Sequence, residues 1–385
     1  MMKLALNQIS ILGILITLFF VSCSKDKSIS DEPPTEAGYN WAATADSMQL
    51  ATYNSYLGTE GTFVQDNAGS TNFNYWPNAH VLHTLVDGYE RTKDASYIPK
   101  MKSLLLGIKS KNGNTFSNVF NDDMLWLGNA CVRAYLVTND IDYKEAAEFL
   151  WEDIILSYSE VFGGGITWKK DTPNEKNAVS NGPAIILAMR LYDLDKEERY
   201  LNWAKDLYEW QKANLVDPQS GLVWDNIKIT NGQVSTNKDW VFTYNVGTWI
   251  GAGLRLFQVT NEQVYLDDAL KTAKSTMEST KLTTDGVMRN EGQGDGGLFK
   301  GILARYFTEL ALSKNINASD QELFVSYMQF NAVTLHDKGL IRPFMLAGPD
   351  WSKKPFGVTI DLTTQLSGLM LIEAAAKLDN ANLFN

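Results

Sequence analysis

Apolar residues recur at spacings of three and four from Trp41 onward, which places them on one face of an α-helix. Six segments are apolar nearly all round, rich in Gly and Ala and poor in charge, as expected of helices that are buried on most sides. Six other segments have one charged face, which is typical of helices with one side in water. The first kind lies at residues 76–91, 122–137, 181–193, 244–258, 297–312 and 363–377, and the second at 44–56, 94–110, 142–156, 197–214, 262–278 and 318–335.

The two kinds alternate, outer helix then inner helix, at intervals of about 50–65 residues, which predicts an all-α array of six helical hairpins. Closing the array into a ring gives an (α/α)6 toroid, one domain over residues 41–385, and an open helical solenoid is the alternative. Links from inner to outer helices are short, whereas links from outer to inner helices are long, as at 157–180 and 215–243. Long loops in a compact domain usually carry function. We therefore expect the functional site at the end where the inner helices begin.

Residues 1–22 have the pattern of a bacterial export signal, with Lys3 ahead of a short apolar run at 11–21. A small residue followed by Cys23 resembles a lipoprotein signal of the Bacteroidetes type, which predicts cleavage before Cys23 and a lipid on its thiol. An ordinary signal peptide with an incidental cysteine is the alternative. The polar stretch 23–40 predicts a flexible tether. We expect a protein anchored to the outer membrane, on its cell-surface or periplasmic face, with the lipid as its only membrane contact.

The net charge and the few cysteines and histidines limit the partners and cofactors that we expect. The net charge of −11 argues against nucleic acid as a partner, because binding to phosphates requires a basic surface. With Cys23 lipidated, Cys131 has no partner, and its apolar helical surroundings favour core packing. His80 and His83 lie three residues apart and could share a metal, but the only other histidine, His336, is in a distant loop. We therefore expect neither a metal nor another cofactor, and we expect a monomer.

Aromatic, Asn and Asp side chains gather at the long-loop end, and this mixture suits a sugar. Rings pack on the apolar face of a pyranose, while amides and carboxylates bind its hydroxyls. The adjacent Asp122 and Asp123 open an inner helix, where acidic residues complement the helix dipole and Asn121 would be a suitable N-cap. Two carboxylates held together are also what glycoside hydrolysis requires. The candidates for substrate binding are Trp76, His80, Trp126, Trp168, Asn181, Tyr244, Asn245 and Lys300.

From about Trp41 to the C-terminus the chain resembles glycoside hydrolase family 76, the α-1,6-mannanases of bacteria. The most specific motif is the Asp-Asp pair followed by Met-Leu-Trp at 122–126. The supporting motifs, in order, are Tyr75-Trp76-x-x-Ala79-His80, Gly164-Gly165-Ile166-x-Trp168, the stretch from Lys176 to Gly182, Tyr244-Asn245-x-Gly247, and Phe299-Lys300-Gly301-Ile302.

The resemblance implies an (α/α)6 fold and hydrolysis, without a metal, of α-1,6-linked mannan with retention of configuration. The expected enzyme is an endo-acting mannanase on the backbone of yeast-type mannan, with Asp122 as the nucleophile and Asp123 as the acid/base. Val246 departs from the family, where a polar residue is common, and the fungal relatives act on cell-wall anchor glycans, so the fold alone does not fix the substrate. A non-catalytic surface glycan-binding lipoprotein on the same scaffold is the alternative, and the intact Asp-Asp pair favours the enzyme.

Overall fold

The computed structural model describes residues 38–384, and the expected signal peptide, the lipidation site Cys23 and nearly all of the tether lie outside them. Twelve α-helices, each of 15 to 19 residues, make up most of this described part. The inner helices are α2 (Tyr75–Thr92), α4 (Asn121–Thr138), α6 (Ala178–Asp195), α8 (Thr243–Thr260), α10 (Gly296–Ala311) and α12 (Leu362–Asn380). The outer helices are α1 (Trp41–Tyr56), α3 (Tyr97–Lys111), α5 (Ile141–Ile155), α7 (Glu198–Leu215), α9 (Gln263–Glu278) and α11 (Ala318–Thr334).

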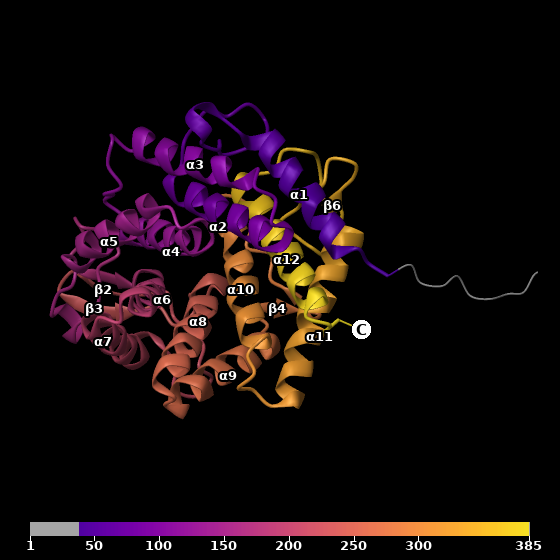
Figure 1. Ribbon diagram of the computed structural model, residues 1–385. Helices are drawn as coiled ribbons and strands as arrows, with labels where there is room; N and C mark the ends of the chain where they lie inside the picture. Colours follow the sequence, from indigo (N-terminus) through magenta and orange to yellow (C-terminus); the bar gives the residue numbers. More distant parts are fainter. Residues whose placement is uncertain (1–37, 385) are drawn as a thin grey trace, which may run out of the picture. The chain divides into compact units, whose positions relative to one another are not determined.

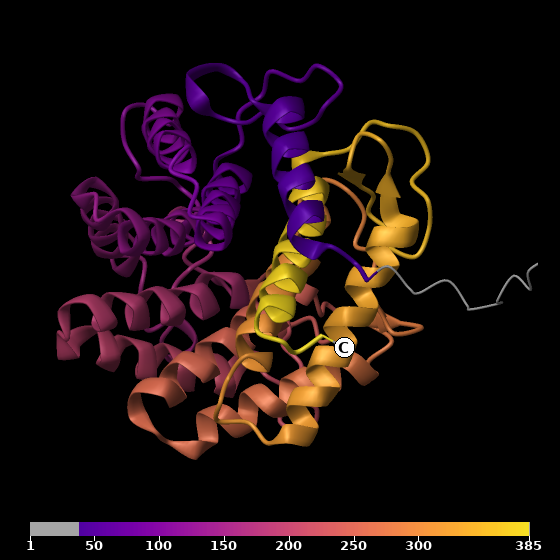
Figure 2. The ribbon, with the colours of Figure 1, turned by 45° about the vertical axis from the view of Figure 1, so that its right-hand side comes forward.

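The helices form a closed ring within residues 40–384. Each inner helix packs against the inner helix of the next hairpin, and α12 packs against both α1 and α2, so the last repeat meets the first. Figures 1 and 2 show this closure, with the indigo α1 beside the yellow α12. In an open solenoid the two ends would not touch. The predicted (α/α)6 toroid is therefore confirmed, with every helix where the hydrophobic pattern placed it to within a few residues.

Short links terminate the inner helices by backbone geometry. Lys93, Asn139, Lys196 and Asn261 directly follow α2, α4, α6 and α8, and each has a left-handed conformation with φ between 55° and 58°. In each case the N–H of this residue bonds to the carbonyl four residues back, which closes the helix end. The next helix starts within a few residues, so the chain reverses at once and the outer helix lies against its own inner helix.

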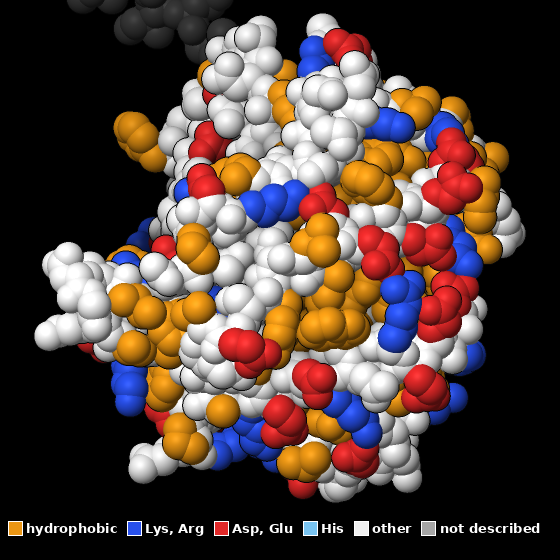
Figure 3. All heavy atoms as spheres, turned by 90° about the vertical axis from the view of Figure 1, so that its left-hand side faces the viewer, with side chains coloured by type: hydrophobic (Ala, Val, Ile, Leu, Met, Phe, Trp, Pro, Cys, Tyr) orange, Lys and Arg blue, Asp and Glu red, His pale blue; other side chains and the backbone are white. Residues whose placement is uncertain are grey.

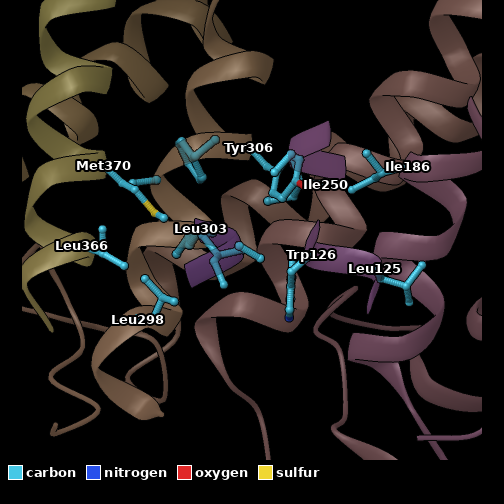
Figure 4. Close-up of a cluster of buried hydrophobic side chains, with 14 of the residues drawn as sticks. Leu125, Trp126, Ile186, Ile250, Leu298, Leu303, Tyr306, Leu366 and Met370 are labelled. Atoms are coloured by element: carbon cyan, nitrogen blue, oxygen red, sulfur yellow. The ribbon is translucent and has the colours of Figure 1, made fainter. Parts of the chain in front are cut away.

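Small residues let the inner helices approach closely. A side chain added at Gly247 would place its Cβ 2.7 Å from the Leu303 Cα, and one at Gly301 would meet the Ser367 Cα at 2.6 Å. The space between the helices is filled by large apolar side chains that point inward from α4, α6, α8, α10 and α12 (Figure 4). This packing explains why the inner segments are rich in Gly and Ala and apolar on most sides.

Strands are confined to the loops. Strand β2 (Asn226–Thr230) pairs antiparallel with β1 (Glu175–Asn177) and with β3 (Gln233–Thr236), which ties the loop before α6 to the loop before α8. Two minimal hairpins occupy later loops, and they are formed by β4 (Thr283–Thr284) with β5 (Val287–Met288), and by β6 (Leu340–Ile341) with β7 (Leu346–Ala347). The long loops at the end where the inner helices begin, here called the front end, are thus braced against one another.

The opposite end, here called the rear end, holds a cavity of about 670 Å³ lined by charged side chains. Cations near the carboxyl ends of helices complement the helix dipole, and carboxylates of the same helices pair with several of them. Ala42, in the first turn of α1, also lines this cavity, so the described chain enters the fold at the rear end. Each inner helix contributes one basic residue to the lining: Arg91, Arg133, Arg190, Arg255, Arg305 and Lys377.

The surface carries charges of both signs. On the face drawn in Figure 3, acidic and basic side chains are interspersed, and the described residues form no broad basic patch there. Among residues 38–384, no helix has both the length and the apolar character that a membrane span requires.

Candidate active site

Asp122 and Asp123 are the second and third residues of α4 and are partly exposed at the front end. The expected N-cap role of Asn121 is wrong, because Asn121 is already helical and its amide points to a neighbouring loop. Its Nδ2 donates to the Thr167 carbonyl at 2.9 Å, and its Oδ1 accepts from the Ser157 hydroxyl at 3.2 Å. The start of α4 is therefore fastened to the loop that precedes α6.

That fastening brings Trp168 to the aspartates. The Asn121 N–H donates to the Trp168 carbonyl at 3.0 Å, and the Trp168 N–H donates to the Glu175 carbonyl at 3.1 Å. The Trp168 ring lies 5.4 Å from the Phe120 ring, and its side chain acts to lower the pKa of Asp122. Trp168 is only partly buried. It can thus both act on one carboxylate and offer a ring face to a ligand.

The electrostatics separate the two carboxylates. Burial raises the pKa of Asp122 to about 7, although the hydrogen bonds from Trp168 and from nearby backbone N–H groups oppose the rise. Burial also raises the pKa of Asp123, and the negative charges of Asp122 and Asp295 raise it further. No hydrogen bond opposes the rise at Asp123. The pair therefore holds one proton more readily than two isolated carboxyls would, and that proton resides preferentially on Asp123.

Two further acids, outside the set of candidates from the sequence, adjoin the pair. Asp225 is 7% exposed and accepts from the Asn245 Nδ2 at 2.9 Å and the Tyr244 hydroxyl at 3.2 Å, and its charge acts on Asp122. Asp295 precedes α10, accepts from the Trp76 Nε1 at 3.1 Å and acts on Asp123. Asp225 lies in the loop before α8, and Asp295 directly precedes α10. Their position near the start of an inner helix is the one signal that the sequence offered for these two acids.

Aromatic rings form a wall beside these acids. The Phe299 ring stacks on the Tyr244 ring at 3.9 Å with an interplanar angle of 4°, and it lies 6.4 Å from the Trp76 ring. Trp76 itself is 8% exposed, with its indole N–H held by Asp295. The structure thus brings Trp76, Trp168 and Tyr244 to the same end of the toroid as Asp122 and Asp123. Phe299 was within a quoted motif but not among the candidates.

Two aromatic candidates lie deeper than expected. His80 is completely buried and Trp126 is 2% exposed, with 4.8 Å between their ring centroids, and the Trp76 ring lies 5.6 Å from the His80 ring. Burial and the charge of Arg305 lower the pKa of His80 well below its ordinary value, so the ring is neutral. His80 thus packs between Trp76 and Trp126, and the expected contacts of His80 and Trp126 with substrate stay predictions. Among residues 38–384, no three His, Cys, Asp or Glu side chains gather as metal ligands would.

The Asn181 amide is fully used in holding a loop, and its expected contact with substrate stays a prediction. Its Oδ1 accepts from the Ile166 N–H at 2.8 Å, and its Nδ2 donates to the Ile166 carbonyl at 3.1 Å. Asn78 holds Phe63 in the same way from α2, and Gln365 accepts from the Ala347 N–H from α12. Each amide is the fourth residue of its inner helix, so the repeat uses this position to fasten the preceding loop.

Asn245 and Lys300 are likewise buried. The Asn245 amide donates to Asp225, so it positions that acid, while its Oδ1 has no hydrogen-bond partner. The Lys300 ammonium donates to the Pro349 carbonyl and lies 4.2 Å from the centroid of the Trp351 ring, so it fastens the loop before α12. Burial lowers the pKa of Lys300 to about 7. Lys300 is 2% exposed, and its expected contact with substrate stays a prediction.

A carboxylate pair that shares a proton, beside an aromatic wall at the mouth of a helical toroid, defines a carbohydrate-active enzyme of the hydrolase type. The family model described as glycosyl hydrolase family 76 matches residues 40–383. The chain therefore belongs to glycosyl hydrolase family 76.

Several relatives are similar over long stretches. The structure of the GH76A α-1,6-mannanase from Salegentibacter sp. HEL1_6 has 57% sequence identity and a TM-score of 0.87, covering 88% of this chain and 100% of that chain. The Lin0763 protein from Listeria innocua has 34% identity and a TM-score of 0.82, covering 90% of this chain and 100% of that chain. A putative mannan endo-1,6-alpha-mannosidase of Schizosaccharomyces pombe is 24% identical over 282 residues, which is 67% of this chain. The chain spans only 63% of the length of that curated relative and 51% of another from Candida glabrata.

Proposed function

We propose that this chain hydrolyses α-1,6-mannosidic linkages within mannan, as an endo-acting enzyme that retains anomeric configuration. The observation that carries the proposal is the pair of consecutive aspartates at the start of α4, inside an aromatic-walled site. The Salegentibacter relative is an α-1,6-mannanase, and its inactive variant, in which two consecutive aspartates are replaced by asparagine, is in complex with α-1,6-mannotriose. Asp122 and Asp123 are consecutive aspartates in the corresponding fold.

In the proposed mechanism Asp122 attacks the anomeric carbon and Asp123 protonates the leaving oxygen. Hydrogen bonds from Trp168 and the backbone at the helix N-terminus stabilise the ionised form of Asp122. The charges of Asp122 and Asp295 keep Asp123 protonated for its role as an acid. Once Asp122 is bonded to the sugar its charge is gone, so the proton affinity of Asp123 falls. Asp123 can then act as the base that activates water in the second step.

Replacement of each aspartate by asparagine tests this assignment. Asp122→Asn and Asp123→Asn keep the shape and remove the chemistry, so each should lose nearly all turnover of α-1,6-mannan while binding persists. A matched control is Asp142→Asn, since Asp142 also lies in the first turn of a helix but bonds to Lys102 on an outer helix. Near-normal turnover by Asp123→Asn would contradict the two-aspartate mechanism. Binding of mannan without turnover by the unmodified chain would instead favour the glycan-binding alternative.

Product analysis tests the stereochemistry and the mode of cutting. Proton NMR of the first product should show the α-anomer, since retention preserves the configuration of the α-linkage. An initial β-anomer would overturn the role of Asp122 as nucleophile. If the enzyme is endo-acting, oligosaccharides of several lengths should appear early in the digestion of polymeric mannan. Steady release of a single short product would contradict endo action.

We also propose that the protein is a lipoprotein of the outer membrane, attached through Cys23. The short apolar run that ends at Cys23 supports this, as does the polar stretch 23–40 that follows it. The proposed organisation is a signal peptide at 1–22, a tether at 23–40 and the catalytic domain at 41–385.

A further inference from the structure

The aromatic wall of the site continues outward along the loop that precedes α8. The Phe242 ring lies 6.1 Å from the Tyr244 ring and 5.7 Å from the Phe299 ring. The Trp240 ring lies 6.4 Å beyond Phe242, at an interplanar angle of 53°. Trp240, Phe242, Tyr244 and Phe299 therefore form one continuous row of rings, here called the aromatic row.

The inner end of the aromatic row is attached to the acids. The Tyr244 hydroxyl donates to Asp225, and the charge of Asp122 acts on Tyr244. At the outer end the Asp225 N–H donates to the Trp240 carbonyl at 2.9 Å. The same acid is thus bonded to the row at two points. A ligand that reaches the carboxylates can therefore extend along the row without leaving the front end.

The loop that carries Trp240 is fixed before any ligand binds. The Trp240 N–H donates to the Asn237 carbonyl at 3.2 Å, and the adjacent Asp239 carboxylate pairs with the Lys281 ammonium at 2.9 Å. A loop that is already ordered loses less conformational entropy when a ligand binds. The backbone therefore presents Trp240 in a set position.

Trp240 nevertheless leaves much of its side chain in water. It is 47% exposed, whereas Trp126, Trp151, Trp249 and Trp351 are each no more than 2% exposed. An exposed tryptophan contributes little to the core, and its flat face is suited to the apolar face of a pyranose ring. Phe149 on α5 is also 47% exposed, but it lies on an outer helix and has no place in the row.

We propose that Trp240 forms an additional sugar subsite at the outer end of the aromatic row, taking a mannosyl unit distant from the bond that is cut. This inference rests on the proposed function. It makes Trp240 a specificity-determining residue for chain length, because only oligosaccharides long enough to span the row gain the contact. The subsite supplies ring stacking rather than charge, so it accepts any unbranched unit that presents an apolar face.

The test compares kcat/KM over a series of purified α-1,6-manno-oligosaccharides of increasing length. Trp240→Ala should lower the ratio of kcat/KM on the longest substrate to that on the shortest by about three- to tenfold, the worth of one stacking contact. Trp240→Tyr, which keeps a flat ring, should recover most of the ratio. Phe149→Ala, which removes a ring of equal exposure elsewhere, should leave the ratio unchanged.

Two other outcomes separate the inference from the proposed function. If the unmodified enzyme cleaves the series but Trp240→Ala lowers kcat/KM equally at every length, or at none, the subsite is overturned and the mannanase activity stands. If the unmodified enzyme cleaves no member of the series, the proposed function fails and the subsite fails with it.

Discussion

Glu309 pairs with the buried Arg190 and the partly exposed Arg255 at the rear end, and removing its charge should destabilise the toroid. Its carboxylate lies 3.1 Å from the Arg255 Nη2 and 3.8 Å from the Arg190 Nη2, with 21% of its side chain exposed. Burial acts to raise the pKa of Glu309, but the surrounding positive charges outweigh it and lower the value from 4.5 to about 2. The difference corresponds to about 3 kcal/mol of stability, at 1.36 kcal/mol per pKa unit. Glu309→Gln should lose roughly that amount at pH 7.

The stability that Glu309 contributes should decrease as the pH falls. Because the pKa of Glu309 is depressed in the folded state, its contribution is complete above the unfolded value of 4.5 and disappears as the pH falls toward 2. Urea unfolding of the unmodified chain and of Glu309→Gln should therefore differ by about 3 kcal/mol at pH 7 and by less than half of that at pH 3. The control Glu152→Gln breaks an exposed pair with Arg199 and should cost at most about 1 kcal/mol. A difference for Glu309→Gln that matches the control, or that does not shrink at pH 3, would refute the reasoning.

Three other changes test separate parts of the structure. Gly247→Ala should lower the free energy of unfolding by about 1–3 kcal/mol, because the new Cβ meets the Leu303 backbone, and unchanged urea unfolding would contradict the helix contact. Asp295→Asn keeps the acceptor for Trp76 but removes a charge that raises the pKa of Asp123, so the alkaline limb of the kcat/KM profile should move to lower pH; an unmoved limb would show that this charge does not act. Cys23→Ser should release the protein from membranes or leave it unprocessed, and acylated, membrane-bound protein would exclude Cys23 as the anchor.

The fold could be predicted from the sequence because its determinants are local and repeat. Helical spacing, an apolar surface on the inner segments and short links are each visible within one hairpin, and six copies reinforce one another. Closure of the ring depends on contact between α12 and α1, which are about three hundred residues apart. No local pattern encodes that contact, so the choice between toroid and solenoid needed the structure.

The residues of the candidate site were harder to predict from the sequence, because a polar residue near the front end can face either a ligand or a loop. The sequence placed Asp122 and Asp123 together because they are adjacent. It could not show that the amide of Asn181 faces Ile166, or that Lys300 faces Pro349, since those partners lie in loops of irregular backbone. Asp225 lies in a loop at the expected end of the toroid, but the sequence did not show that its charge acts on Asp122, since that proximity depends on how the loop before α8 folds.

The described chain enters the fold at the rear end, opposite the end that carries Asp122 and Asp123. An inner helix of 18 residues is about 27 Å long, at 1.5 Å per residue, and this length separates the aspartates from the end at which α1 begins. If Cys23 carries a lipid as proposed, the 18 residues from 23 to 40 reach at most about 60 Å when extended. The tether would then join the domain at the end opposite the aspartates. The attachment point would therefore not obstruct the mouth of the site, and a long polymer could enter that mouth without passing the tether.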